Sequence, residues 1–383
     1  MRPRSVALLL AATLLTVCPS LVQSADTAAP AGKGKPIDVV ICLDVSGSME
    51  GLTAQARAKL WDLVNDFARV QPTPQLRVGL YSYGHTTGQG YDPKTGWVRK
   101  ETDLTTDLDE VYKRLNGLHI DGGEEYVARV TRDALNEQKW SEDPKALKLV
   151  FVCGNEPVNQ DPDVKLADVA KLAKSKGVLI NTIYCEYGHP EEAKGWQDYA
   201  ADCGGKFARI EHNRNIVQIQ TPFDKQMAEL NGKFNDTFVA YGKEGDAKKD
   251  NQAAQDKNAA ASGAQVANSR LASKASALYR NSDWCLVCKS LEDPKFDITK
   301  VPVEELPEEL KKLTPEKRVE YLNKKKAERA DLQKKINDLN AHRQKFVDAE
   351  MKKHATEADK ALDAALRSIV REQAAAKGIK VPE

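Results

Sequence analysis

The chain has 383 residues, with 57 Lys and Arg against 56 Asp and Glu, and a formal net charge of +1. This length accommodates two domains and at least one large core. The near-zero charge argues against a dedicated nucleic-acid binder, because such proteins carry a basic excess. No apolar run is long enough to span a membrane, so we expect no transmembrane segment in the mature chain.

Residues 1–24 have the pattern of a secretory signal peptide. Arg2 and Arg4 give a positive start, and Val6–Val17 is an apolar stretch too short to cross a bilayer. Small residues stand at the cleavage positions that follow. We therefore expect an exported protein, periplasmic or secreted, with a linker at residues 25–35.

Six cysteines follow the signal peptide, and in an oxidising compartment they allow many pairings. Cys42 lies in an apolar run and is predicted to be a buried small hydrophobe. Cys285 and Cys288 have the spacing of a redox motif but no thioredoxin-like strand and helix around them. We interpret them as a structural pair or as two free thiols. No second such pair accompanies them, which argues against zinc.

Strand and helix patterns alternate from residue 36 to residue 220. Apolar runs predict strands at Ile37–Leu43, Leu76–Tyr83, Val98–Thr102, Leu147–Cys153, Val178–Cys185 and Lys206–Ile210. Helical spacing predicts helices at residues 52–70, 108–115, 126–140, 164–176 and 196–203. Such alternation implies right-handed crossovers between parallel strands. The predicted fold class is therefore α/β, with a doubly wound, mostly parallel sheet.

Residues 221–383 are predicted to be helical. An aromatic stripe from Phe223 to Tyr241 predicts one helix, closed by a glycine. Residues 243–275 are polar and weakly patterned, which fits either a loose helix or a flexible tether. Residues 314–377 carry two narrow apolar stripes with a break near His354. We expect two helices folded as a partly coiled-coil-like hairpin, which would also allow self-association.

The segment Asp44-Val45-Ser46-Gly47-Ser48 follows the first predicted strand. Ligands bind at the carboxyl ends of strands in open α/β sheets, and this turn offers only oxygen atoms there. Such donors suit a hard cation, Mg²⁺ or another divalent ion such as Mn²⁺ or Ca²⁺. The alternative is a helix start at which Ser48 caps backbone N–H groups.

Residues 36–220 resemble the von Willebrand factor A (VWA) domain family in strand order, length and the signature from Asp44 to Ser48. The resemblance implies a metal-ion-dependent adhesion site (MIDAS). There both serines bind the ion directly and the aspartate acts through water. A partner's carboxylate often fills the open position, so the resemblance implies a protein or cell-surface ligand.

Two loops depart from the family pattern. Where the family has a threonine after two glycines, this chain has Glu124 and Glu125. Where it has an aspartate after the fourth strand, this chain has Asn155 and Glu156. We expect Glu125, or else Glu124, to replace the threonine, and Asn155 or Glu156 to reach the ion from the other loop. Extra carboxylate would strengthen cation binding and weaken the attraction for an acidic partner.

The sequence shows no catalytic constellation. The histidines lack metal-ligand spacing, and neither a nucleophile elbow nor a phosphate loop is present. A hydrolase that used the ion to activate water would need a general base that the sequence does not display. We therefore expect a non-enzymatic, exported binding or adhesion module. The alternative is a structural or assembly protein that acts through its C-terminal helices, with the VWA-like part as a degenerate scaffold.

Overall fold

The centre of the molecule is a six-stranded sheet. The computed structural model describes residues 34–49, 61–86, 88–186, 188–211, 219–354 and 357–381, so the predicted signal peptide lies outside the described residues. The strands are β1 (Pro36–Asp44), β2 (Gln75–Tyr83), β3 (Val98–Thr105), β4 (Leu147–Gly154), β5 (Leu179–Glu186) and β6 (Phe207–Glu211). Each agrees with a predicted strand to within a few residues.

The strand order is β3-β2-β1-β4-β5-β6, and all neighbours are parallel except β2 and β3. The predicted fold class, a doubly wound and mostly parallel sheet followed by helices, is confirmed. β1 lies between β2 and β4, with Asp44 opposite Tyr83 and Leu43 opposite Cys153. Because the strands on its two sides are reached by connections in opposite directions, the carboxyl end of β1 is a switch point of the sheet.

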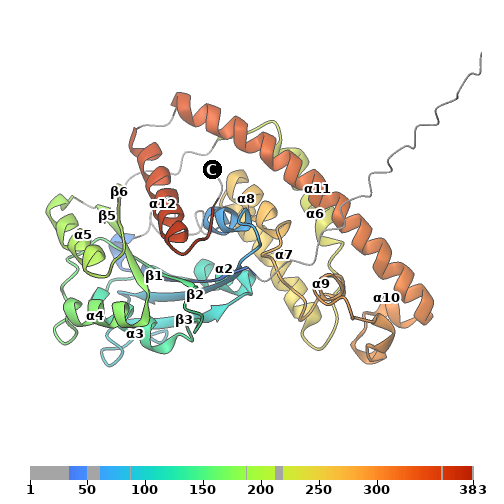
Figure 1. The fold of residues 1–383 in the computed structure, drawn as a ribbon, viewed down its shortest axis with the longest axis horizontal. Coiled ribbons are helices and arrows are strands. Elements are labelled where there is room, and N and C mark those ends of the chain that lie inside the picture. The colour runs from blue at the N-terminus through green and yellow to red at the C-terminus, as the bar shows by residue number, and fades with distance from the viewer. Residues whose placement is uncertain are drawn as a thin grey trace, which may run out of the picture.

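Helices cover both faces of this sheet (Figure 1). One face packs against α3 (Val127–Glu137), α4 (Leu166–Lys176) and α5 (Ala193–Asp202). The other packs against α2 (Leu108–Asn116) and a helix at residues 61–68. Residues 50–60, the first part of the predicted helix at 52–70, lie outside the described residues. Both faces of the central strands are therefore buried, as their continuous apolar runs indicated.

The second half of the described chain is helical. Its helices are α6 (Asp224–Asn235), α7 (Gly245–Ala261), α8 (Ala264–Lys274), α9 (Leu286–Glu292), α10 (Glu308–Lys311), α11 (Pro315–His354) and α12 (Glu357–Ala376), with short 3-10 turns η3 (Ile298–Lys300) and η4 (Val303–Glu305). A further 3-10 turn, η2 (Pro190–Glu192), precedes α5 in the first half. The prediction of one helix through the aromatic stripe is wrong. After α6 the chain is extended, and the N–H of Leu286 donates to the carbonyl of Val239 at 2.9 Å. Phe238 thus packs from a non-helical segment.

The predicted hairpin of the last two helices is also wrong. The break near His354 is present, but the apolar stripes face different partners. Leu332, Ile336 and Leu339 of α11 pack in a cluster with α6 and α9, whereas Ile369 and Val370 of α12 pack in the cluster on one face of the sheet. A narrow apolar stripe indicates that one side of a helix is buried, but it does not identify the element that covers this side.

α12 returns from the end of the chain to the sheet (Figure 1). Gln373 exchanges two hydrogen bonds with Asn181 of β5, at 3.0 and 2.7 Å. The Lys35 Nζ donates to the carbonyl of Lys377 at 2.6 Å. The predicted boundary at residue 220 stays a prediction, but the layer that covers the sheet uses residues from both sides of it. Among the residues described, no helix has the length and apolar character that crossing a membrane requires.

Candidate metal-binding site

Asp44 ends β1 and is fully buried. Its Oδ1 accepts a hydrogen bond from the N–H of Ser46 at 2.8 Å, which fixes the carboxylate in the turn that follows the strand. The N–H of Val45 donates to the carbonyl of Tyr83 at 2.9 Å, so the contact with β2 continues one residue beyond the strand. The chain then forms the short 3-10 turn η1 (Gly47–Met49). This turn holds both predicted serines beside the strand end.

Two hydroxyls and one amide form the second part of the site. The Oγ atoms of Ser46 and Ser48 are 3.3 Å apart. Asn155, directly after β4, is buried and lies 3.1 Å through Oδ1 and 2.8 Å through Nδ2 from the Ser48 Oγ. Because β4 is the neighbour of β1, its end delivers Asn155 to the turn. The structure thus brings these predicted residues together.

Glu125 completes this group from the loop before α3. Its carboxylate is hydrogen-bonded to the Ser46 side chain. Burial, with the nearby charge of Glu156, raises the pKa of Glu125 to about 7. Glu124, by contrast, is exposed. Of the two glutamates that the sequence offered, Glu125 is the one that the structure places at the serines.

The sequence analysis missed Gly84, which forms one wall of the site. Gly84 has a φ of +84°, and a Cβ added there would lie 2.7 Å from Asp44 Oδ1 and 3.1 Å from Glu125 Cγ. Only glycine combines this conformation with so close an approach. The available signal was the position of Gly84, directly after the strand that neighbours β1.

Backbone contacts hold the Glu125 loop against this wall. The N–H of Asp121 donates to the carbonyl of Val45 at 3.0 Å, and the Thr86 hydroxyl donates to the Asp121 carboxylate. A Cβ on Gly123 would lie 2.4 Å from the carbonyl oxygen of His85, so this glycine allows the two loops to touch. These backbone contacts between the two loops therefore decide that Glu125, and not Glu124, lies beside the serines.

The electrostatics of the site favour a cation. Asp44 Oδ2 is buried, and no atom of the described residues forms a hydrogen bond with it. Burial raises the pKa of Asp44 well above its ordinary value; the Ser46 N–H opposes this, and the charges of Glu125 and Glu156 add to it. An unpaired buried oxygen beside other carboxylates is costly, and a divalent ion would relieve that cost.

The donor chemistry fits a hard ion. Carboxylate, hydroxyl and amide oxygens are the ligands that Mg²⁺ and Ca²⁺ prefer. No cluster of three or more His, Cys, Asp or Glu side chains arranged to hold a metal is present in the described ranges. A cation at this position would therefore depend on Ser46, Ser48 and Asn155 as well as on Asp44 and Glu125.

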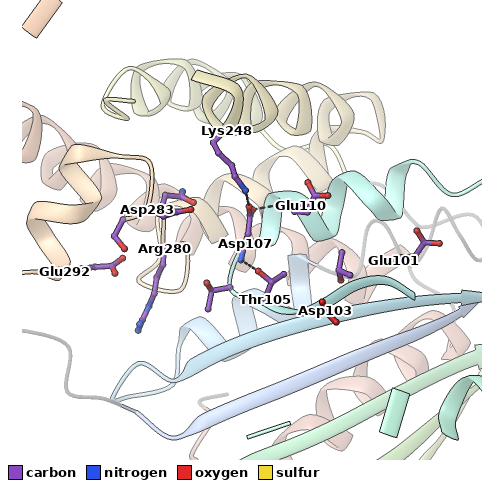
Figure 2. Close-up of a pocket in the computed structure, with 13 residues that line it drawn as sticks. Glu101, Asp103, Thr105, Asp107, Glu110, Lys248, Arg280, Asp283 and Glu292 are labelled. Atoms are coloured by element: carbon purple, nitrogen blue, oxygen red, sulfur yellow. Dashed lines mark hydrogen bonds and ion pairs between the residues drawn. The ribbon is translucent and has the colours of Figure 1, made fainter. Parts of the chain in front are cut away.

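A separate cleft lies where β3 and α2 meet the helical half (Figure 2). Six carboxylates line it, but several have basic partners: Lys248 of α7 pairs with Asp107, and Arg114 with Glu110 at 2.8 Å. Glu101 pairs with Arg99 at 2.6 Å. The cleft contains none of the predicted site residues, and of these three ion pairs only Lys248–Asp107 joins the helical half to the sheet part of the chain.

The arrangement of Asp44, Ser46 and Ser48 at the carboxyl end of a central strand agrees with a comparison of sequence families. Residues 38–221 match the von Willebrand factor type A domain. We call these residues the VWA region. The helices after residue 221 lie outside the match. No curated protein sequence matches the chain.

Several solved structures are similar to part of the chain. The SpRpn10 VWA domain is 16% identical with a TM-score of 0.36, over 47% of this chain and 90% of that one. Proximal thread matrix protein 1 from the mussel byssus, with a zinc-occupied MIDAS motif, is 14% identical with a TM-score of 0.36, over 47% and 43%. The open conformation of the pilus adhesin SpaC from Lactobacillus rhamnosus GG is 14% identical with a TM-score of 0.35, over 48% and 28%. The match thus spans less than half of the mussel and pilus chains.

Proposed function

We propose that the VWA region binds a divalent cation at Asp44, Ser46 and Ser48, with further oxygens from Glu125 and Asn155. Mg²⁺ is the ion we favour, with Mn²⁺ and Ca²⁺ as alternatives. The observation that carries this proposal is the unpartnered Asp44 Oδ2, buried among hydroxyls and a second carboxylate at a switch point of the sheet. Oxygen donors that converge there match the preference of a hard cation.

We further propose that the bound ion serves recognition of a protein or a cell surface, and not catalysis. VWA domains are, in general, interaction modules, and residues 38–221 match that family. The pattern of residues 1–24 supports export to the periplasm or the exterior, where such a ligand would be met. The helical half would then position the VWA region toward its partner.

Asp44→Asn tests the cation site. We expect Mg²⁺ to raise the melting temperature of the parent and to leave that of Asp44→Asn unchanged. At a concentration one hundred times Kd, specific binding stabilises a protein by about 2.7 kcal/mol. Without the ion the variant should be at least as stable as the parent, because a neutral amide costs less to bury than a carboxylate. Calorimetric titration and thermal unfolding, each with and without chelator, measure both effects.

Asp168→Asn provides the matched control, because Asp168 is an exposed carboxylate on α4. It should respond to Mg²⁺ as the parent does. If Asp44→Asn binds the ion with the parent's affinity, the site is assigned wrongly. If neither protein binds any of the three ions, the cation proposal fails.

The recognition proposal has its own test. Immobilised parent and Asp44→Asn are exposed to a cell-envelope extract with Mg²⁺ or with chelator. We expect at least one protein to be retained only by the parent and only with Mg²⁺. Retention that is equal in all arms would instead favour the alternative function, assembly through the C-terminal helices.

A further inference from the structure

Cys285 and Cys288 lie at the start of α9, in the interior of the helical half. Both are free and buried, and Cys285 has no exposed surface. Cys285 precedes the helix, and its Sγ accepts a hydrogen bond from the N–H of Cys288 at 3.5 Å. Two thiols in one helical turn are close enough to interact with each other.

A buried arginine from the long helix α11 contacts both sulfurs. Arg329 Nη1 lies 2.9 Å from the Sγ of Cys288, and Nη2 lies 3.6 Å from the Sγ of Cys285. The same guanidinium donates to the Thr237 carbonyl at 2.7 Å and stacks 4.0 Å from the ring centroid of Phe238. Arg329 is 3% exposed, so its charge lies inside the apolar cluster.

The buried charge of Arg329 is stabilised by a negatively charged partner, and the two cysteine sulfurs are the groups in contact with it that can ionise. Within the described residues, the hydrogen bonds and ion pairs of Arg329 include no Asp or Glu. Burial alone would raise the pKa of Cys285, but the Cys288 thiol, the Arg329 charge and the Cys288 N–H lower it below its ordinary value. Burial raises the pKa of Cys288, which keeps its proton. The reduced pair is therefore a thiolate and a thiol.

We propose that Cys285 and Cys288 are a redox-active pair that hydrogen peroxide oxidises to a disulfide, and that this oxidation loosens α11 because it removes the anionic partner of Arg329. The proposal concerns a second site and is independent of the cation site. Cys285 has no exposed surface, so an oxidant reaches its sulfur only when the packing around α9 opens. A small opening suffices for hydrogen peroxide, whereas a protein disulfide would need a much larger one.

The chemistry proceeds in two balanced steps. The Cys285 thiolate attacks one peroxide oxygen, the O–O bond breaks, and hydroxide leaves, which gives a sulfenic acid. The Cys288 sulfur then attacks the Cys285 sulfur, the S–S bond forms, and the S–O bond breaks. The hydroxyl leaves with the proton of Cys288 as water. The two cysteines lose two electrons, and one peroxide gains them.

We expect oxidation of Cys285 and Cys288 to lower the stability of the protein. A structural disulfide normally stabilises by restricting the unfolded chain, but a loop this short restricts it little. Here oxidation also leaves the Arg329 charge buried without an anion, which is strongly unfavourable. The packing of α11 on α6 and α9 should therefore weaken on oxidation and recover on reduction.

The test uses the full chain, reduced and then treated with stoichiometric hydrogen peroxide. Digestion without reductant, followed by mass spectrometry, should show a disulfide between Cys285 and Cys288. Cys42 and Cys203 are internal controls, because burial raises the pKa of both thiols, and they should stay unmodified. The Tm should fall by roughly 3 °C or more. Dithiothreitol should restore it, which separates this effect from methionine oxidation.

Two variants locate the cause. In Arg329→Met the buried charge is absent, so oxidation should no longer lower the Tm. In Cys285→Ser the ultraviolet thiolate absorption of the parent at neutral pH should be lost. Excess peroxide that forms no disulfide at these cysteines would overturn the proposal, and so would a disulfide that leaves the Tm unchanged or raises it. Both outcomes are read on the parent chain, so the proposal remains testable if a variant fails to fold.

Discussion

We expect Glu125 to replace the threonine of the VWA pattern, which would add a negative charge to the proposed cation site. Burial raises the pKa of both Asp44 and Glu125, and the nearby charge of Glu156 adds to both shifts. A divalent ion would be held more firmly here than by a hydroxyl in that place. The occupied site would also attract a partner's carboxylate less, because the protein's own oxygens already balance the ion.

Glu125 should make the cation-free protein less stable as the pH rises. Its folded pKa, about 7, lies above the ordinary 4.5, so between these values the folded state binds more protons than the unfolded state. Stability is then lost as the pH rises through this window. For a partly exposed group we expect a loss of about 1 to 2 kcal/mol. Denaturant titrations of the parent and of Glu125→Gln, in chelator, measure it; the variant should lack the slope.

Glu124→Gln is the control for this prediction, because it changes an exposed neighbour of the same type. It should keep the parent's pH dependence. Saturating Mg²⁺ should abolish the slope in the parent, since the ion competes with the proton. If Glu125→Gln keeps the slope, another buried carboxylate is responsible, and Asp44 is the next to test.

The site could be predicted from sequence only where its residues lie close in the chain. Asp44, Ser46 and Ser48 occupy one turn after one strand, so their proximity needed no tertiary information. The loop after the fourth strand came from the resemblance to the VWA family, and the sequence did not decide between Asn155 and Glu156. Glu124 and Glu125 could not be separated, because one residue of loop register decides between them. Gly84 was missed because its role depends on the registration of β2 against β1.

At the scale of elements, a buried ion-pair network joins the helical half to the VWA region. Arg270 of α8 contacts Asp109 of α2 and Asp256 of α7, both at 2.6 Å. Lys274 contacts Asp256 at 2.7 Å. These charges are almost fully buried, so they are worth little when complete and costly when broken. The network therefore fixes the position of α7 and α8 on α2.

Arg270→Met should destabilise the protein by about 3 to 5 kcal/mol, because it leaves Asp109 and Asp256 buried with less positive charge. Chemical denaturation monitored by tryptophan fluorescence would measure this loss.

Lys194→Met tests whether burial is the cause. Lys194 pairs with Asp198 at 2.7 Å on the surface, and its loss should cost less than about 1 kcal/mol. Equal costs for the two variants would show that the buried network does not hold the helices in place.

This network explains why the sequence pattern does not decide between a loose helix and a flexible tether for residues 243–275, where the structure has α7 and α8. The segment is polar, so it carries little of the apolar periodicity that identifies a helix. Its polar side chains instead pair with one another and with α2. The strands were predicted well because a strand buried on both faces is a continuous apolar run in the sequence. The sequence of a polar helix, or of a helix with a narrow apolar stripe, does not show which elements it packs against.

For the whole molecule, the decisive feature is the return of α12 to the sheet. Ile369, Val370 and Ala374 join the apolar cluster to which β1 and β2 also contribute, and Gln373 satisfies the buried Asn181. A fragment of residues 36–220 would contain every strand but would lack this helix. The sheet and the layer that covers it are thus drawn from opposite ends of the chain.

Removal of residues 357–383 should destabilise the sheet. The loss of three buried apolar side chains, with two hydrogen bonds to Asn181, should cost at least about 3 kcal/mol. Urea denaturation of the truncated and full chains, followed by far-ultraviolet circular dichroism, provides the comparison.

Ile369→Ala and Lys380→Ala in the full chain form a matched pair, because Ile369 is buried and Lys380 is exposed. The first should cost about 2 to 5 kcal/mol and the second almost nothing. A truncated chain as stable as the full one would mean that the sheet does not need α12.

The return of α12 also constrains the order of events during synthesis. Asn181 and Gln373 are 192 residues apart, and Lys35 and Lys377 are 342 apart. Contacts so distant along the chain close large loops and slow folding. A ribosome adds residues in order, so the sheet emerges long before the helix that seals it. The nascent chain therefore exposes the part of the sheet face that α12 covers until this last helix is made, and chaperones would meet it in that interval.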